Sequence, residues 1–412
     1  MTEHGGVHDR RNYLLNLTEG AFWISGGSFI ASATVLPALI LHLGGGNVAV
    51  GSLNVLVWVG ILLPQTFAAR FTQTLEWKKP WAFRYGAMQR TVVFLIGVIV
   101  LVGGASYPTL TLALFFIFFT LNQVLIGVSS PGWFDMYAKM TPLELRGRLT
   151  GIRSALAGAG SFACSFLLTF LLATFVFPYN YGVAFLIASA FQFTSLILLG
   201  RLVEGVPSKI VPLAPLRNYA LQLKGIFVGN TEFRKFVIAS ILLTFATLPV
   251  GFMTVYAMHR FGAGEAYVGK FTILIVSGQI AGSVINGFIA DRKGNKLALL
   301  VASCSLLAAS ICAFLAPSLE WFYPAFFFLG INLGSELMTR YNLAIEYCPV
   351  EQRSTYLGLM NTMMAPFFLV GIFGGWLANV AGYQAVFGVG ILCSLIGITF
   401  LAVKVKEPRH AM

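Results

Sequence analysis

Charge is what this chain has least of. Only 10% of its 412 residues are charged, whereas a soluble domain carries about 25%. Hydrophobic residues make up 57% of the chain and the mean hydropathy is +0.81. A water-soluble core cannot hide that much apolar surface, so the composition excludes a soluble enzyme or binding module and predicts a polytopic membrane protein.

Features of several other protein classes are also missing. The five cysteines show no metal-ligand spacing, so we expect free thiols, no metal site and no cofactor. The sequence contains no G-x-x-x-x-G-K-[ST] motif and no loop that could hold an ATPase domain. Its first nineteen residues are polar, and the first apolar run is too long for a cleaved signal peptide. The apolar runs are long and unbroken, which favours helices over barrel strands.

Long apolar runs are what the chain has instead. We expect an all-α membrane protein with a cytoplasmic N-terminus (1–19), a six-helix bundle (20–202), a cytoplasmic linker (203–234), a second six-helix bundle (235–403) and a cytoplasmic C-terminus (404–412). The twelve predicted spans are 20–43, 48–71, 91–107, 109–131, 149–177, 181–202, 235–259, 266–289, 297–316, 321–344, 354–379 and 383–403.

The basic residues predict the orientation. Nearly all of them, Arg90 and Lys139 included, fall in or beside loops on the side of the termini, and only Arg260 and Lys270 fall on the other side. An excess of Lys and Arg marks the cytoplasmic face, so both termini are expected there, in a cytoplasmic (inner) membrane. The net charge of +12 is then explained by anionic lipid headgroups, without a nucleic-acid partner. Glu19 is interpreted as a solvated residue at a helix start.

The two halves of the chain repeat each other. "TPLELRGRLTG" (141–151) and "CPVEQRSTYLG" (348–358) share a proline, an arginine and a glycine at identical spacing. "ATVLP" (33–37) also matches "FATLP" (245–249), in the same order along the chain. Two parallel six-helix repeats are typical of a transporter whose binding site lies between the repeats.

The segment "GFIADRKGNK" (287–296) resembles the loop signature of the major facilitator superfamily. Gly287, Asp291, Arg292, Gly294 and Lys296 match the signature, while Asn295 departs from it. The resemblance implies the twelve-helix fold of that family, alternating access, and a gate of ion pairs on the cytoplasmic side. The predicted gate residues are Asp291, Arg292, Glu346, Arg353, Arg146 and Asp135.

The resemblance also implies that spans one, four, seven and ten line the central cavity. These spans carry polar side chains at helical spacing, and further amides lie in the neighbouring spans. The candidate solute-binding residues are Ser25, Ser28, Ser32, Asn122, Gln123, Thr247, Gln279, Asn332, Glu336, Arg340 and Asn361. For the serines and the threonine, helix packing is the competing interpretation.

Glu336 is the sharpest single feature of the sequence. A charge at the centre of a membrane costs about 2.5–3.5 kcal/mol on insertion scales, so Glu336 should face a cavity or a partner. It either carries a proton during transport or forms a structural ion pair with Arg340, one helical turn away.

We therefore expect a monomeric secondary transporter, not an enzyme, that moves a small solute by alternating access. Its partners are that solute, the bilayer and, if Glu336 titrates, protons. The alternatives are an exporter or flippase of amphipathic drugs or lipids, a receptor that binds without transport, and an intramembrane enzyme. The sequence does not reveal the solute.

Overall fold

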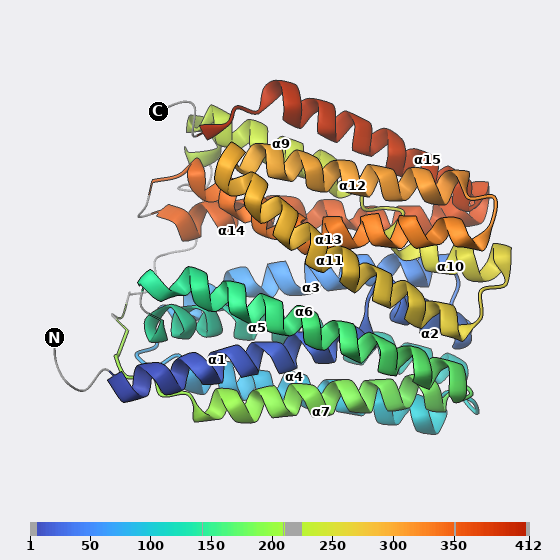
Figure 1. The fold of residues 1–412 in the computed structure, drawn as a ribbon, viewed down its shortest axis with the longest axis horizontal. Coiled ribbons are helices and arrows are strands. Elements are labelled where there is room, and N and C mark those ends of the chain that lie inside the picture. Colours follow the sequence, from blue (N-terminus) through green and yellow to red (C-terminus); the bar gives the residue numbers. More distant parts are fainter. Residues whose placement is uncertain (1–5, 142, 209, 211–224, 350–351, 409–412) are drawn as a thin grey trace. The chain divides into compact units, whose positions relative to one another are not determined.

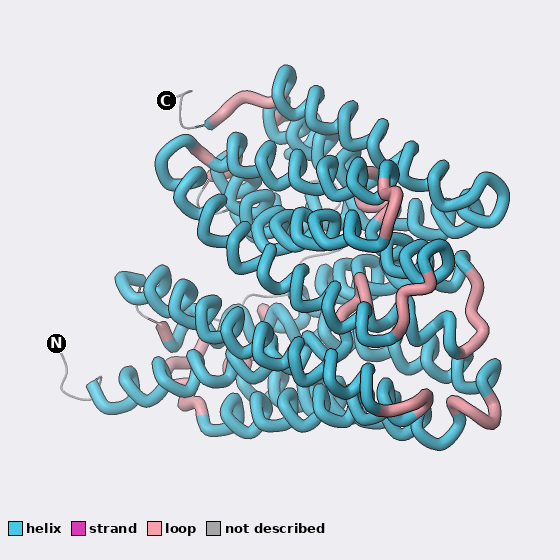
Figure 2. Tube along the Cα trace, turned by 45° about the vertical axis from the view of Figure 1, so that its right-hand side comes forward, coloured by secondary structure: helices cyan, strands magenta, loops and turns pink. Residues whose placement is uncertain are grey.

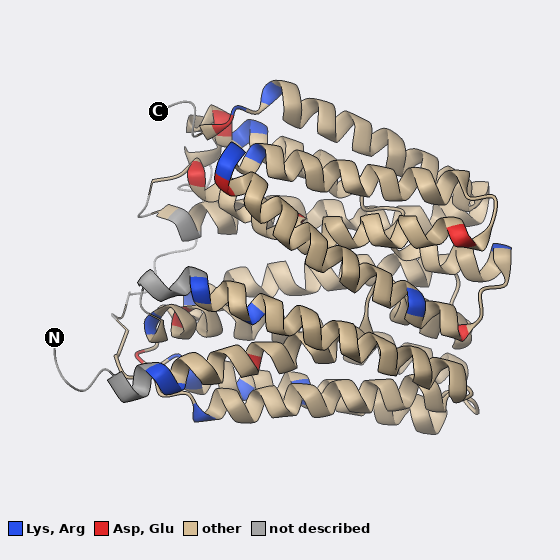
Figure 3. Ribbon diagram, in the orientation of Figure 1, with Lys and Arg blue, Asp and Glu red and all other residues tan. Residues whose placement is uncertain are grey.

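The structure is a computed structural model, and it describes residues 6–141, 143–208, 210, 225–349 and 352–408. Among these residues there are helices, turns and loops but no strand (Figure 2). Most of the helices in each unit described below are nearly free of charge along their middle (Figure 3). The predicted all-α membrane architecture is confirmed.

The chain divides into two compact units. The first holds residues 1–31, 42–44 and 60–213, and the second holds residues 32–41, 45–59 and 214–412. The second unit therefore includes two segments from the N-terminal half of the sequence. The predicted six-helix bundles, residues 20–202 and 235–403, divide the chain according to its sequence repeat. That division stays a prediction.

In the first unit, long helices run side by side (Figure 1). The α1 helix packs against α6 and α7, and α4 packs against α5 and α7. The elements are α1 (Gly6–Gly27), η1 (Ser28–Ile30), the second half of α3 (Asn47–Thr72), α4 (Lys79–Gly103), α5 (Pro108–Met140), α6 (Leu143–Thr174) and α7 (Tyr179–Arg201).

In the second unit, α13 packs against α11 and α12, and α15 packs against α9 and α12. The elements of this unit are α2 (Val35–His42), the first half of α3, α9 (Thr231–Phe245), α10 (Val250–Phe261), α11 (Glu265–Lys293), α12 (Asn295–Leu315), η2 (Leu319–Trp321), α13 (Phe322–Glu346), α14 (Arg353–Met364), η4 (Ala365–Leu369) and α15 (Val370–Lys404).

All twelve predicted spans are helical. Ten stretches of the described residues are helical, long and apolar enough to cross a membrane, and nine of them match one predicted span each. The tenth, 355–404, merges the last two predicted spans, but Gly382 interrupts its helical geometry with φ 80° and ψ 171°. The remaining predicted span is α13, whose 25 residues include Glu336 and Arg340.

The third span begins twelve residues before its predicted start at 91, because α4 starts at Lys79 with Pro80 in its first turn. Arg90 therefore lies inside a helix, and only 5% of it is exposed. The interpretation of Arg90 as a residue beside a loop is wrong. Hydropathy counts every arginine as polar, so it predicts that the apolar span starts after Arg90. Only the partners of the side chain show that this arginine can be buried.

Spans one and seven are both broken, at the positions that repeat in the sequence. The first break lies between η1 and α2, within "ATVLP", and the second separates α9 from α10, within "FATLP". Each motif ends in a proline near the start of the second helix, where proline is tolerated because the N–H has no partner in the helix. Broken helices expose backbone groups, which membrane proteins use where the chain lines a cavity.

Candidate solute-binding sites and charged clusters

A cavity of about 90 Å³ lies between the two helix breaks of the second unit. Ser32 and Ala33 line it from the first break, and Thr247 and Leu248 line it from the second. The remaining lining residues are Val50, Gly51, Leu53, Asn54, Val57, Trp58, Val250, Gly251, Phe252, Leu333 and Gly371. Two of the predicted solute-binding residues, Ser32 and Thr247, thus line one cavity.

Hydrogen bonds hold the broken segments around this cavity. The carbonyl oxygen of Ala33, which the break leaves outside a helix, accepts a hydrogen bond of 2.8 Å from Thr254 Oγ1. Asn54 Nδ2 donates to Thr247 Oγ1 at 3.3 Å, and Thr247 Oγ1 donates to the carbonyl of Thr244 at 2.8 Å. The cavity therefore combines an aromatic ring from Trp58 with an amide and two hydroxyl groups, a mixture typical of sites for small molecules.

Beside this cavity, the segment 45–59 packs tightly on α15. A Cβ atom added to Gly51 would lie 2.0 Å from the carbonyl oxygen of Gly371, and one added to Gly375 would lie 2.5 Å from that of Asn47. Asn47 also donates to Asn379 Oδ1 at 2.9 Å. Only glycine permits backbones to approach this closely. We call the contacts among Asn47, Gly51, Gly371, Gly375 and Asn379 the glycine contact.

Glu336 and Arg340 form an ion pair on α13. Both residues line a second, very small cavity together with Asn332 and Thr247. Arg340 Nη1 also donates to the sulfur of Met364 at 3.6 Å. The pair is therefore present, and whether Glu336 also carries a proton stays a prediction.

The other predicted solute-binding residues mostly make contacts inside their own unit. Ser25 packs against Gly160, and Gln123 packs against Gly60. Asn122 accepts a hydrogen bond from Gln89, Asn332 donates to the carbonyl of Ala302, and Asn361 donates to Tyr341. Ser28 is buried in η1, and the backbone of Gln279 lies against Gly334.

The first unit contains a buried charged cluster that the sequence interpretation missed. Glu19 lies on α1 and is only 2% exposed, so its interpretation as a solvated residue is wrong. Its carboxylate accepts hydrogen bonds from Arg153 Nη2 at 2.7 Å and from Ser195 Oγ at 2.9 Å. A second guanidinium, that of Arg90, donates to Ser195 Oγ at 3.2 Å. We call Glu19, Arg90, Arg153 and Ser195 the buried charge cluster.

A group of amides continues from this cluster. Gln89 Nε2 donates to Asn122 Oδ1 at 2.6 Å and to Gln192 Oε1 at 3.4 Å. All three side chains are buried. Spacing gives only a partial signal, because Gln192 and Ser195 lie three residues apart on one face of α7, and nothing in the sequence pairs that face with α4.

Two further carboxylates, Glu204 and Glu407, occupy matching places in the two units. Each lies three residues after the last residue of a helix, α7 and α15 respectively, and each accepts a backbone hydrogen bond at the start of a helix. Glu204 accepts from the N–H groups of Lys78 and Lys79 at 2.8–3.0 Å, and Glu407 accepts from that of Lys296 at 2.9 Å. A carboxylate at a helix N-terminus satisfies free N–H groups and the helix dipole.

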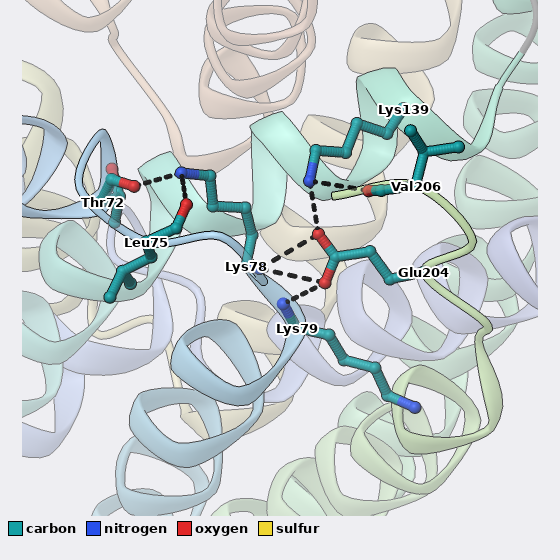
Figure 4. Close-up of polar contacts among 7 residues, drawn as sticks. All are labelled: Thr72, Leu75, Lys78, Lys79, Lys139, Glu204 and Val206. Atoms are coloured by element: carbon teal, nitrogen blue, oxygen red, sulfur yellow. Dashed lines mark hydrogen bonds and ion pairs between the residues drawn. The ribbon is translucent and has the colours of Figure 1, made fainter. Parts of the chain in front are cut away.

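Glu204 is also an ion-pair partner (Figure 4). Lys139 Nζ lies 2.7 Å from Glu204 Oε1 and also donates to the carbonyl of Val206. Lys139 is therefore held by a carboxylate and does not simply anchor the helix to headgroups. Lys78 Nζ turns the other way and donates to the carbonyl oxygens of Thr72 and Leu75.

Burial alone would raise the pKa of Glu204. The hydrogen bonds from Lys139 and from the backbone of Lys78 and Lys79 outweigh burial and hold the pKa of Glu204 below its ordinary value of 4.5.

We predict that Glu204→Gln destabilises the protein by about 1.5–3 kcal/mol, the usual loss for hydrogen bonds to a charged group. Because the folded pKa is the lower one, the carboxylate stabilises the fold fully above pH 4.5 and loses that effect as the pH falls through the folded value. Thermal unfolding of the purified protein in detergent, measured between pH 7 and pH 3.5, tests this. Glu76→Gln changes an exposed carboxylate and is the matched control. Equal unfolding temperatures for the two variants would contradict the prediction.

The predicted gate residues lie mostly near helix ends. Asp291 and Arg292 are exposed in the last turn of α11, and Glu346 ends α13. Glu346 accepts a hydrogen bond of 2.8 Å from Asn295, the residue that departs from the family signature. Asp135 is exposed on α5, near the charges of Lys78 and Lys139. The side chains of Arg146 and Arg353 lie outside the described residues, and the gate stays a prediction.

A bundle of long apolar helices with two broken spans and buried polar clusters defines a polytopic membrane protein. Residues 20–368 and 237–412 match the sequence profile of the Major Facilitator Superfamily, so the chain belongs to that family.

Two curated relatives come from Acinetobacter baylyi. The 4-hydroxybenzoate transporter is 26% identical over 163 residues, which are 38% of this chain and 35% of that one. The niacin transporter is 31% identical over 118 residues, 26% of each chain. The matched segments thus span only about a quarter to a third of these relatives. The crystal structure of a D-xylose–proton symporter has a TM-score of 0.64 at 17% identity and covers 97% of this chain and 98% of that one, a likeness of fold.

Proposed function

We propose that this protein is a secondary transporter that carries a small organic solute across the cytoplasmic membrane by alternating access, with the solute seated at the cavity between the two helix breaks. The observation that carries the proposal is that both breaks, which repeat in the sequence, line one cavity. Transporters built from repeats bind solutes where broken helices meet. The two relatives named for 4-hydroxybenzoate and niacin support a small organic acid as the solute.

The glycine contact supports the alternating-access part of the proposal. It joins the start of span two to α15, which follows the linker, beside the loop between spans one and two. If both termini are cytoplasmic, as the basic residues predict, this contact closes the outer side of the protein. Transport then requires the contact to break and reform in each cycle.

Counterflow into proteoliposomes tests the proposal. The liposomes are loaded with one unlabelled solute at a time from a panel of aromatic acids, aliphatic acids and their neutral amides, and uptake of the labelled form is followed. Counterflow needs no driving force, so it detects a carrier whichever ion drives transport in the cell. Failure of every solute in correctly folded, inserted protein would overturn the transporter proposal and favour a receptor.

We predict that Gly51→Ala lowers counterflow about fivefold to a hundredfold, since overpacking typically costs 1–3 kcal/mol and here opposes one state of the cycle. The new Cβ would clash with the backbone of Gly371, and no change of side-chain rotamer can relieve a clash with backbone. Gly388→Ala adds the same atom to α15 with only one neighbour, at 3.8 Å, and should transport normally. Equal rates for the two variants would show that the glycine contact plays no part in the cycle.

A further inference from the structure

We propose that Arg153 binds the carboxylate group of an organic-anion solute at a second site, in the first unit, which shares no residue with the cavity between the helix breaks. Glu19 occupies this position when no solute is bound. The inference rests on the proposed transport function and names the solute class and a recognition residue for it. It starts from the buried charge cluster, which contains two guanidinium groups and only one carboxylate. A buried excess charge is costly unless a partner arrives, and the missing partner here is an anion.

The two arginines are held in different ways. Arg90 donates to the carbonyl of Gln192 at 2.7 Å, to that of Gly86 at 3.0 Å and to Ser195 Oγ at 3.2 Å, and it lies over the ring of Trp23. All three nitrogens of its guanidinium are thus engaged with neutral groups, so Arg90 is a structural residue.

Arg153 has donors to spare. Its Nη2 atom bonds to Glu19, and its buried Nε atom has no hydrogen-bond partner. A guanidinium has five N–H donors and favours a carboxylate that bridges two of them. One ion pair therefore leaves Arg153 able to bind a second carboxylate, or to exchange Glu19 for it.

Arg153 is also the accessible member of the ion pair. Its side chain is 12% exposed, whereas that of Glu19 is 3% exposed. On α5, the rings of Trp133 and Tyr137 stack on each other at 5.2 Å, and Arg153 lies over both. These rings support the guanidinium and offer an apolar surface to the body of a small organic acid.

Gly20 provides a way to move Arg153 without changing any charge. A Cβ atom added there would lie 1.6 Å from Arg153 Nε, inside the space that the guanidinium occupies. Because the obstructed group is the far end of a flexible side chain, Gly20→Ala displaces the guanidinium and leaves the helices in place.

The test measures binding of matched probes to the purified full chain in detergent, by titration calorimetry: benzoate against benzamide, nicotinate against nicotinamide, and hexanoate against hexanamide. We expect at least one acid to bind more tightly than its amide. For that acid, Arg153→Gln should raise Kd about tenfold to a hundredfold, as expected for hydrogen bonds to a charged group. Gly20→Ala should also raise Kd, and Glu19→Gln should lower it by removing the competing carboxylate. Arg148→Gln, an exposed arginine on the same helix, should leave Kd within about twofold.

Two results would overturn the inference: no acid preferred over its amide, or equal Kd values for Arg148→Gln and for a folded Gly20→Ala. Gly20→Ala keeps the test decisive if Arg153→Gln does not fold. Failure of the transport proposal looks different. Binding through Arg153 without counterflow would refute transport and keep the inference. Counterflow of a neutral solute, with no acid preferred over its amide, would support transport and refute the inference.

Discussion

Linking residue 47 to residue 379 should stop transport completely and reversibly. Asn47 and Asn379 share a hydrogen bond of 2.9 Å across the glycine contact, so cysteines at these positions lie within reach of a short bifunctional methanethiosulfonate reagent. A covalent link fixes the contact in its closed form, and a carrier that cannot open one side cannot complete a cycle. Counterflow should fall by more than about tenfold, because a locked protein no longer exchanges between the two states.

The experiment uses a variant whose five native cysteines are replaced by alanine, since all five are free thiols. The single variants Asn47→Cys and Asn379→Cys, treated with the same reagent, separate cross-linking from simple modification. Reduction of the linked protein should restore the rate. Full counterflow by protein shown to be cross-linked would mean that this contact stays closed throughout the cycle, and the alternating-access proposal in its present form would fail.

Removing the guanidinium of Arg90 should have the largest effect on folding. Arg90→Met takes away three hydrogen bonds, two of which join α4 to α7, and the contact with Trp23. Each hydrogen bond from a charged group contributes about 1.5–3 kcal/mol, so losing three of them should cost several kcal/mol. We expect most of the expressed protein to be lost from the monodisperse peak in size-exclusion chromatography.

Two comparisons make this prediction specific. Arg84→Met removes an exposed arginine from the same helix and should behave like the native protein. Arg90→Lys keeps the charge but not the planar group with donors on three nitrogens, so its loss of stability should be intermediate. If Arg90→Met proves as stable as Arg84→Met, the buried charge cluster does not hold α4 and α7 together.

The sequence alone predicted the class of protein and most of its helices. Low charge and long apolar runs leave few options in a membrane, because every backbone group must be satisfied within a helix or a barrel. The twelve spans followed from hydropathy. The "ATVLP" and "FATLP" segments predicted a repeat but no break, and the structure shows that spans one and seven both break there. The "GFIADRKGNK" segment indicated the family that the profile match then showed.

Only the tertiary structure could decide which polar residues share a site. Ser32 and Thr247 line one cavity because two broken helices meet there, and no local pattern encodes a contact between residues more than 200 positions apart. The same limit hid the buried charge cluster. Glu19, Arg90 and Arg153 each resemble an ordinary charged residue near a membrane surface when taken singly. Burial of a charge depends on its partners, and the four residues of this cluster come from four helices, α1, α4, α6 and α7.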